Sequence, residues 1–196
     1  MIAEDILAAI TPVVDAFEQL GIRYHIGGSV ASSVYGVARS TLDADLVADL
    51  HYAQIAAFVA RLGTAYYLDQ DAIQDAVQRR ASFNLIHLDT MIKVDVFVLK
   101  AHAFDQAAFQ RTRQAALDKT DPRVFPLASP EDVVLHKLGW YRAAGGVSDR
   151  QWNDILGVLK VQAIRLDRAY LQQWAARLDL TDLLDRAWQE AGVPES

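Results

Sequence analysis

The chain has 196 residues, of which 52% are hydrophobic and 22% charged, with a net charge of −6 at pH 7. Such a chain can bury one sizeable core, and its negative balance disfavours a surface built to bind nucleic acid. It contains no cysteine, which excludes disulfides, thiolate metal sites and cysteine catalysis. Because it has no apolar run of about 18 residues and no leader-like start, we expect a cytoplasmic protein without a membrane span.

Hydrophobic periodicity divides the chain into a mixed part and a helical part. In chain order, the first part is expected to form helix 3–20, strand 22–26, helix 29–35, strand 42–50, helix 52–62, strand 66–68, helix 71–79, strands 83–88 and 91–99, helix 103–117 and strand 123–127. From Ser129 onward four amphipathic helices follow, the first opening with a serine cap and a first-turn proline. We therefore expect an α+β domain with a small mixed sheet over residues 1–127, and a helical bundle over 128–196 that packs against it.

Two acids interrupt the apolar strand expected at 42–50. Residues two apart in a strand share a face, so Asp43 and Asp45 lie side by side while Ala44 faces a core. Two carboxylates fixed in this way repel each other, and Mg²⁺ bound through oxygen ligands would cancel the repulsion. The alternative is an ordinary polar strand face in solvent.

A third acid lies in the later apolar stretch "IKVDVFVL". Here Lys93, Asp95 and Phe97 share a face. If this strand neighbours the first one, Asp95 joins the acid pair in a cluster suited to two metal ions and phosphoryl transfer. The alternative for Asp95 is a salt bridge with Lys93 or with a nearby arginine.

A short turn, Gly27-Gly28-Ser29, follows the strand expected at 22–26. Glycines allow backbone N–H groups to approach a phosphate, and the start of the next helix attracts anions. The turn matches neither the P-loop nor the dinucleotide-binding fingerprint, and a plain structural turn is the alternative.

Together these features resemble the nucleotidyltransferase superfamily related to DNA polymerase beta: a strand, Gly-Ser at a helix start, thirteen intervening residues, Asp-x-Asp on a strand, and a later strand Asp. The resemblance implies that Gly27, Gly28 and Ser29 hold a nucleoside triphosphate. It also implies that the two acids of the first strand bind metal, and that the third completes the metal site and helps to activate the attacking hydroxyl.

Further residues are brought in by the same resemblance. Arg39 and Thr41 occupy positions where related members carry polar groups facing phosphate; the alternative for Arg39 is a surface charge. The helical part looks like small bacterial nucleotidyltransferase-like proteins related to abortive-infection and toxin–antitoxin transferases. These carry a lysine on the first such helix and an aspartate on the next, here Lys137 and Asp154. Lys137 would contact the triphosphate; its alternative is a solvated lysine paired with Asp154.

The activity implied by the resemblance is Mg²⁺-dependent transfer of a nucleoside monophosphate from an NTP to a hydroxyl, with release of pyrophosphate. The acceptor stays open between a tRNA end, a hydroxyl of a partner protein and a small molecule such as an aminoglycoside. Alternatives are a catalytically silent protein that binds a nucleotide or a partner, and an antitoxin-like role through the helical bundle. Association with a partner protein or with a second copy is equally open.

Overall fold

The computed structural model describes residues 2–118 and 122–193, and its centre is a seven-stranded mixed sheet. The strands of this sheet are β1 (Tyr24–Ile26), β2 (Asp43–Ala48), β3 (Tyr66–Tyr67), β4 (Ser82–His87), β5 (Lys93–Val98), β6 (Arg113–Ala116) and β7 (Val124–Leu127). Their order across the sheet is β3-β4-β5-β2-β1-β7-β6. The two strands that carry the acids, β2 and β5, are therefore parallel neighbours at the middle of the sheet.

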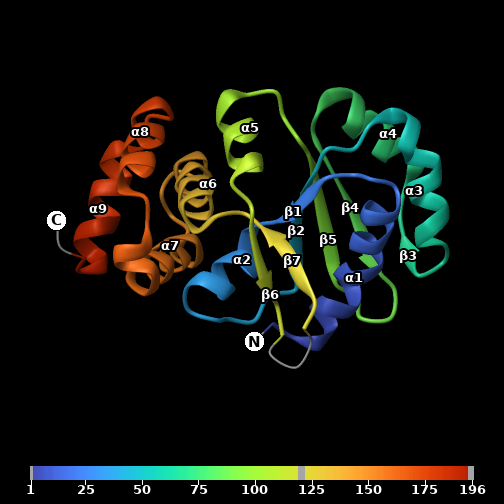
Figure 1. Ribbon diagram of the computed structural model, residues 1–196, viewed down its shortest axis with the longest axis horizontal. Coiled ribbons are helices and arrows are strands. Elements are labelled where there is room, and N and C mark those ends of the chain that lie inside the picture. Colours follow the sequence, from blue (N-terminus) through green and yellow to red (C-terminus); the bar gives the residue numbers. More distant parts are fainter. Residues whose placement is uncertain (1, 119–121, 194–196) are drawn as a thin grey trace.

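Helices lie on both sides of this sheet and at one end of the molecule (Figure 1). Those of the first part are α1 (Glu4–Gln19), α2 (Gly28–Tyr35), α3 (Ile55–Leu62, after a 3₁₀ turn at Tyr52–Gln54), α4 (Gln70–Arg79) and α5 (Ala103–Gln110). The bundle consists of α6 (Pro130–Ala143), α7 (Asp149–Gln162), α8 (Arg168–Arg177) and α9 (Thr181–Ala191), with a 3₁₀ turn at Ala163–Arg165. Helix α2 packs on β2 and also on α6 and α7, so it connects the sheet to the bundle.

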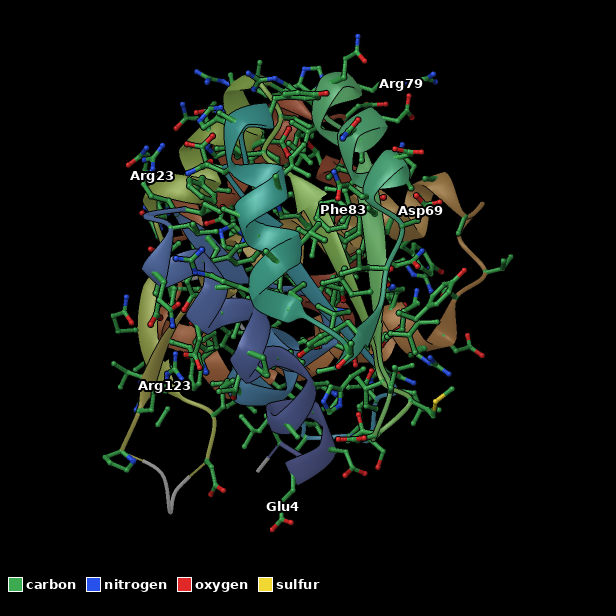
Figure 2. All side chains as sticks on the ribbon, turned by 90° about the vertical axis from the view of Figure 1, so that its right-hand side faces the viewer. Glu4, Arg23, Asp69, Arg79, Phe83 and Arg123 are labelled. Carbon is green, nitrogen blue, oxygen red and sulfur yellow. The ribbon has the colours of Figure 1, made fainter. Side chains whose placement is uncertain are left out.

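One face of the sheet is sealed by α1, α3 and α4. Burial alternates along β2, where Ala44, Leu46 and Ala48 are fully buried on this face. Across the layer Phe17 stacks on Phe58, with ring centroids 5.0 Å apart, and Phe58 meets Phe83 of β4 edge-on at 6.4 Å. Figure 2 looks onto these helices and labels Phe83 on the strand behind them. The opposite face is therefore the one that presents the acids of β2 and β5.

Most of the expected elements are present, with ends shifted by a few residues. Helix α1 runs without interruption through Pro12, and the Thr11 hydroxyl donates to the Leu7 carbonyl at 2.7 Å. At the start of α6 the Ser129 side chain accepts a hydrogen bond from the backbone N–H of Asp132 (3.2 Å), as the serine-proline opening predicts.

The helix expected over 103–117 is wrong beyond Gln110. Residues Arg113–Ala116 instead form β6, which pairs antiparallel with β7 from Arg113↔Leu127 to Ala116↔Val124. The sequence "RQAA" has ordinary helical propensity, but pairing with β7 supplies backbone hydrogen bonds that propensity alone does not anticipate. In the described ranges no helix is both long and apolar enough to cross a membrane.

A close helix crossing fixes α2 against α7. A Cβ placed on Gly36, just after α2, would lie 2.8 Å from the backbone carbon of Gly157. A Cβ on Gly157 would lie 3.2 Å from the backbone nitrogen of Val37. The side chain of Gln162 adds a hydrogen bond to the Tyr35 carbonyl at 2.7 Å. Because neither glycine carries a side chain, the backbones touch and the end of α2 is held directly on the bundle.

Candidate functional site

The Gly-Ser turn, formed by Gly27, Gly28 and Ser29, lies directly against the acid-bearing strand β2. The Gly27 N–H donates to the Asp45 carbonyl at 2.8 Å, and the Ser29 backbone acts to lower the pKa of the Asp45 carboxyl. Gly28 has φ of +51°, and a Cβ on it would stand 1.7 Å from Oδ2 of Asp45. Only glycine fits here, because both the backbone conformation and the space beside the carboxylate exclude a side chain.

Strand register brings the three acids, Asp43, Asp45 and Asp95, onto adjacent positions of one sheet face. Asp45 is the direct register partner of Asp95, and Asp43 is the partner of Lys93. The side chains take separate partners: Asp43 hydrogen-bonds the Thr41 hydroxyl, and Lys93 Nζ lies 2.5 Å from Oδ2 of Asp95. The salt bridge that the sequence left open as the alternative for Asp95 is thus present.

With these partners taken, no three acidic or imidazole side chains of the described residues converge as a ready metal cluster. Whether the carboxylate oxygens of Asp43, Asp45 and Asp95 can bind a cation depends on the charges around them. Burial, followed by the charges of Asp43 and Asp95, raises the pKa of Asp45 to about 6, and Lys137 offsets this only in part. Partly buried carboxylates that repel one another provide the oxygen ligands that a hard divalent cation such as Mg²⁺ prefers.

Beside the Gly-Ser turn lies a cluster of three charged side chains, Arg39, Lys137 and Asp154. Arg39 donates from Nε and Nη2 to the two carboxylate oxygens of Asp154, at 2.8 and 2.9 Å. Lys137 Nζ donates to Asp154 at 2.8 Å and to Gln151 at 2.9 Å. The side chains of Lys137 and Asp154 are only 1% and 5% exposed, so this is a buried pair and not a solvated one.

The cluster has two cations for one anion, which leaves an excess positive charge beside the turn. Burial by itself would raise the pKa of Asp154, but the hydrogen bonds from Arg39 and Lys137 outweigh it and hold that pKa below its usual range. Arg39 also donates from Nη2 to the Ser29 hydroxyl oxygen at 2.6 Å. Since a hydroxyl both accepts and donates, Ser29 keeps its proton for a further acceptor such as a phosphate oxygen.

We expect Asp154→Ala to lower the free energy of unfolding by about 3 kcal/mol, because it leaves the buried Lys137 charge uncompensated. In the matched double variant Lys137→Met/Asp154→Leu, most of that stability should return, because the buried lysine charge is removed together with its partner. Urea unfolding measures the free energy of unfolding of each variant. Equal unfolding free energies for the single and double variants would contradict the buried-pair interpretation.

A cavity of about 120 Å³ lies beside Asp45, between the sheet and α6. Its lining includes Gly28, Asp45 and Lys137 together with two aromatic rings, those of Phe97 and Trp140, whose centroids are 6.2 Å apart. Trp140 is 37% exposed and forms part of the lining of this cavity.

The lining of the cavity also includes His25 and His136. Burial, followed by the influence of His136, lowers the pKa of His25 to about 3, so this residue is uncharged at neutral pH. Gln151, which was not predicted from the sequence, lies one helical turn before Asp154 and shares its contact with Lys137. That i, i+3 spacing is the signal that would have found it.

No known family model and no curated protein sequence matches the chain. Solved structures do match it. The chain superimposes with a TM-score of 0.60 on antibiotic-resistance factor ANT(2'')-Ia, at 14% identity over 92% of this chain and 96% of that one. It also matches the lincosamide antibiotic adenylyltransferase LnuA (TM-score 0.50, 15% identity, 82% and 98% covered). A third match is an antigenic nucleotidyltransferase-like protein from Paracoccidioides brasiliensis (TM-score 0.50, 17% identity, 96% and 94% covered). At such identities the likeness concerns the fold, and it confirms the nucleotidyltransferase fold expected from the sequence.

Proposed function

We propose that this chain, which has the fold of the nucleotidyltransferase superfamily, transfers a nucleoside monophosphate from an NTP to a hydroxyl and releases pyrophosphate. The observation that carries the proposal is the contact between Gly28 and Asp45, where a Cβ would stand 1.7 Å from the carboxylate. A turn suited to bind phosphate and a carboxylate suited to bind a cation are thereby held against each other. Phosphoryl transfer requires these two kinds of group side by side.

Each residue of the site has a separate role in the proposed reaction. Gly28 and Ser29 bind the β- and γ-phosphates at the helix start, with the Ser29 hydroxyl proton as one donor, while Gly27 holds this nucleotide-binding turn on β2 through its N–H bond to the Asp45 carbonyl. Arg39 and Lys137, oriented by Asp154, add positive charge for the leaving pyrophosphate. Both cations are already bonded to Asp154, so little side-chain freedom is lost when substrate binds. Thr41 acts indirectly, by orienting the carboxylate of Asp43 through its hydroxyl.

The three acids provide the oxygen ligands for two Mg²⁺ ions, which when bound supply the charge that neutralises the transferring phosphoryl group. Asp95 has the additional role of accepting the proton of the attacking hydroxyl, since it is the acid on the strand farther from the Gly-Ser turn. In this reaction the oxygen of the attacking hydroxyl forms a bond to the α-phosphorus of the NTP, and the bond between the α-phosphorus and pyrophosphate breaks. The hydroxyl proton passes to the Asp95 carboxylate.

A small molecule is the acceptor class best supported. The cavity beside Asp45 has about 120 Å³ and an aromatic wall from Phe97 and Trp140, dimensions suited to one ring of a compact ligand. ANT(2'')-Ia is described as an antibiotic-resistance factor and LnuA as an adenylyltransferase of lincosamide antibiotics. The net charge of −6 also disfavours a tRNA acceptor.

The experiment is incubation of the protein with each α-labelled NTP, Mg²⁺ and separated small-molecule, RNA and protein fractions of a cell extract. We expect label in a small molecule together with pyrophosphate release, and a loss of at least ~100-fold in Asp43→Asn. Asp49→Asn is the matched control, because Asp49 follows the same strand but pairs with Arg23 at 2.7 Å. Label that survives in Asp43→Asn would refute the mechanism. Nucleotide binding without pyrophosphate release would favour the silent alternative.

A further inference from the structure

Lys93 lies beside the acids that the proposed function assigns to cation binding. It is the first residue of β5, it is the register partner of Asp43, and its Nζ lies 2.5 Å from Oδ2 of Asp95. Residues two apart on a strand share a face, so Lys93 and Asp95 both point to the side of the sheet that carries Asp43 and Asp45.

The lysine interacts with all three carboxylates. The hydrogen bond to Asp95 is the main cause that raises the pKa of Lys93, and the charges of Asp95, Asp43 and Asp45 add to it against the opposing effect of burial. The other cations nearby, Arg39 and Lys137, are committed to Asp154. Of these three cations, Lys93 is thus the one in direct contact with an acid of the cluster, Asp95.

This contact also determines where Asp95 points. Its carboxylate is held by Lys93, and in the described part of the chain the acids do not converge as a metal cluster although the backbones of β2 and β5 are adjacent. The Lys93 side chain is 46% exposed, so it can leave Asp95 for solvent without disturbing the core, whereas Asp95, at 19%, stays on the sheet.

We propose that Lys93 is a tethered counter-ion of the acid cluster, and that Asp95 exchanges Lys93 for a divalent cation when the cation binds. The proposal rests on the proposed function only in taking the three acids as the cation site. Before substrate arrives Lys93 neutralises one of the three carboxylates, that of Asp95, at the cost of weakening divalent-ion affinity. Once released, its ammonium group lies free at the mouth of the site, where an anionic phosphate can take the place of Asp95.

The test is a Mn²⁺ titration of the nucleotide-free protein, with free Mn²⁺ measured by electron paramagnetic resonance. Lys93→Met is expected to bind Mn²⁺ about three- to tenfold more tightly than the unmodified chain, since a half-exposed ion pair competes with the cation. Lys93→Arg keeps the charge and should bind close to the unmodified level. Lys160→Met, which removes an exposed lysine of α7, controls for the loss of one positive charge. Far-ultraviolet circular dichroism establishes that each variant is folded.

A second measurement follows Lys93 itself. The ¹⁵N-bound protons of its ammonium group, assigned by their absence in Lys93→Arg, should show the slow exchange of a hydrogen-bonded group and lose it on addition of Mg²⁺. Unchanged or weaker Mn²⁺ binding in Lys93→Met, or no detectable Mn²⁺ binding by either protein, would overturn the proposal. Failure of the proposed function is distinguishable, because it appears as missing pyrophosphate release in the transfer assay whatever the Mn²⁺ affinities are.

Discussion

Gly28→Ala is expected to reduce nucleotidyl transfer by at least ~100-fold, the loss that a displacement of about 1 Å causes in a preorganised site. A Cβ at this position would stand 1.7 Å from Oδ2 of Asp45, so either the carboxylate or the Gly-Ser turn has to move. The backbone adds its own penalty of about 1–2 kcal/mol, because φ is +51°. Steady-state pyrophosphate release and urea unfolding measure the two effects separately.

Gly21→Ala is the matched control for that variant. Gly21 also has positive φ, at +65°, but a Cβ there meets no atom within 4 Å. It should therefore lose similar stability and keep full activity. Comparable activities for Gly28→Ala and Gly21→Ala would show that contact with Asp45 is not needed for the reaction.

Asp45→Asn is expected to raise the free energy of unfolding by about 2–3 kcal/mol at pH 8 in the metal-free protein, while abolishing transfer. Burial and the neighbouring acids raise the pKa of Asp45 from 3.8 to about 6 in the folded state. For an acid with a raised pKa, stability is fully present below pH 4 and is lost as the pH rises through 6. A shift of about two pKa units corresponds to about 3 kcal/mol, which the neutral asparagine recovers.

Urea unfolding in EDTA at pH 4 and pH 8 measures this difference, with the unmodified chain as reference at each pH. The gain from Asp45→Asn should be close to zero at pH 4 and maximal at pH 8. Asp49→Asn is again the control, because Asp49 is paired with Arg23 and should show no gain at pH 8. A gain of equal size at both pH values would mean that shape rather than charge stabilises the variant.

The acids and the Gly-Ser turn were predictable from the sequence because each is set by local rules. Alternation along β2 places Asp43 and Asp45 on one face, and a glycine pair after a strand marks a turn. The strand register then places Asp45 opposite Asp95, because β2 and β5 are parallel neighbours. The pairing of Lys137 with Asp154 could be predicted only from the family resemblance, because no local pattern links the two helices.

Other parts of the site depend on contacts that local patterns do not encode. Arg39 reaches Asp154 across 115 residues of sequence, and no spacing rule links a loop arginine to a helix in the bundle. Strand β6 was taken for helix because its existence depends on pairing with β7. For Asp95, sequence left a metal ligand and a salt bridge with Lys93 as competing interpretations, although the two describe successive states if the ion exchange proposed for Lys93 occurs.

The direct backbone contact between Gly36 and Gly157 has a consequence for substrate affinity and for evolution. Because α2 begins at the Gly-Ser turn and ends on the bundle, the conformational entropy of ordering the turn is lost during folding and not during nucleotide binding. Substitutions at Trp140, in the cavity proposed to take the acceptor, can therefore accumulate without loosening the Gly-Ser turn. This separation would allow such a scaffold to acquire new acceptors while its reaction chemistry stays constant.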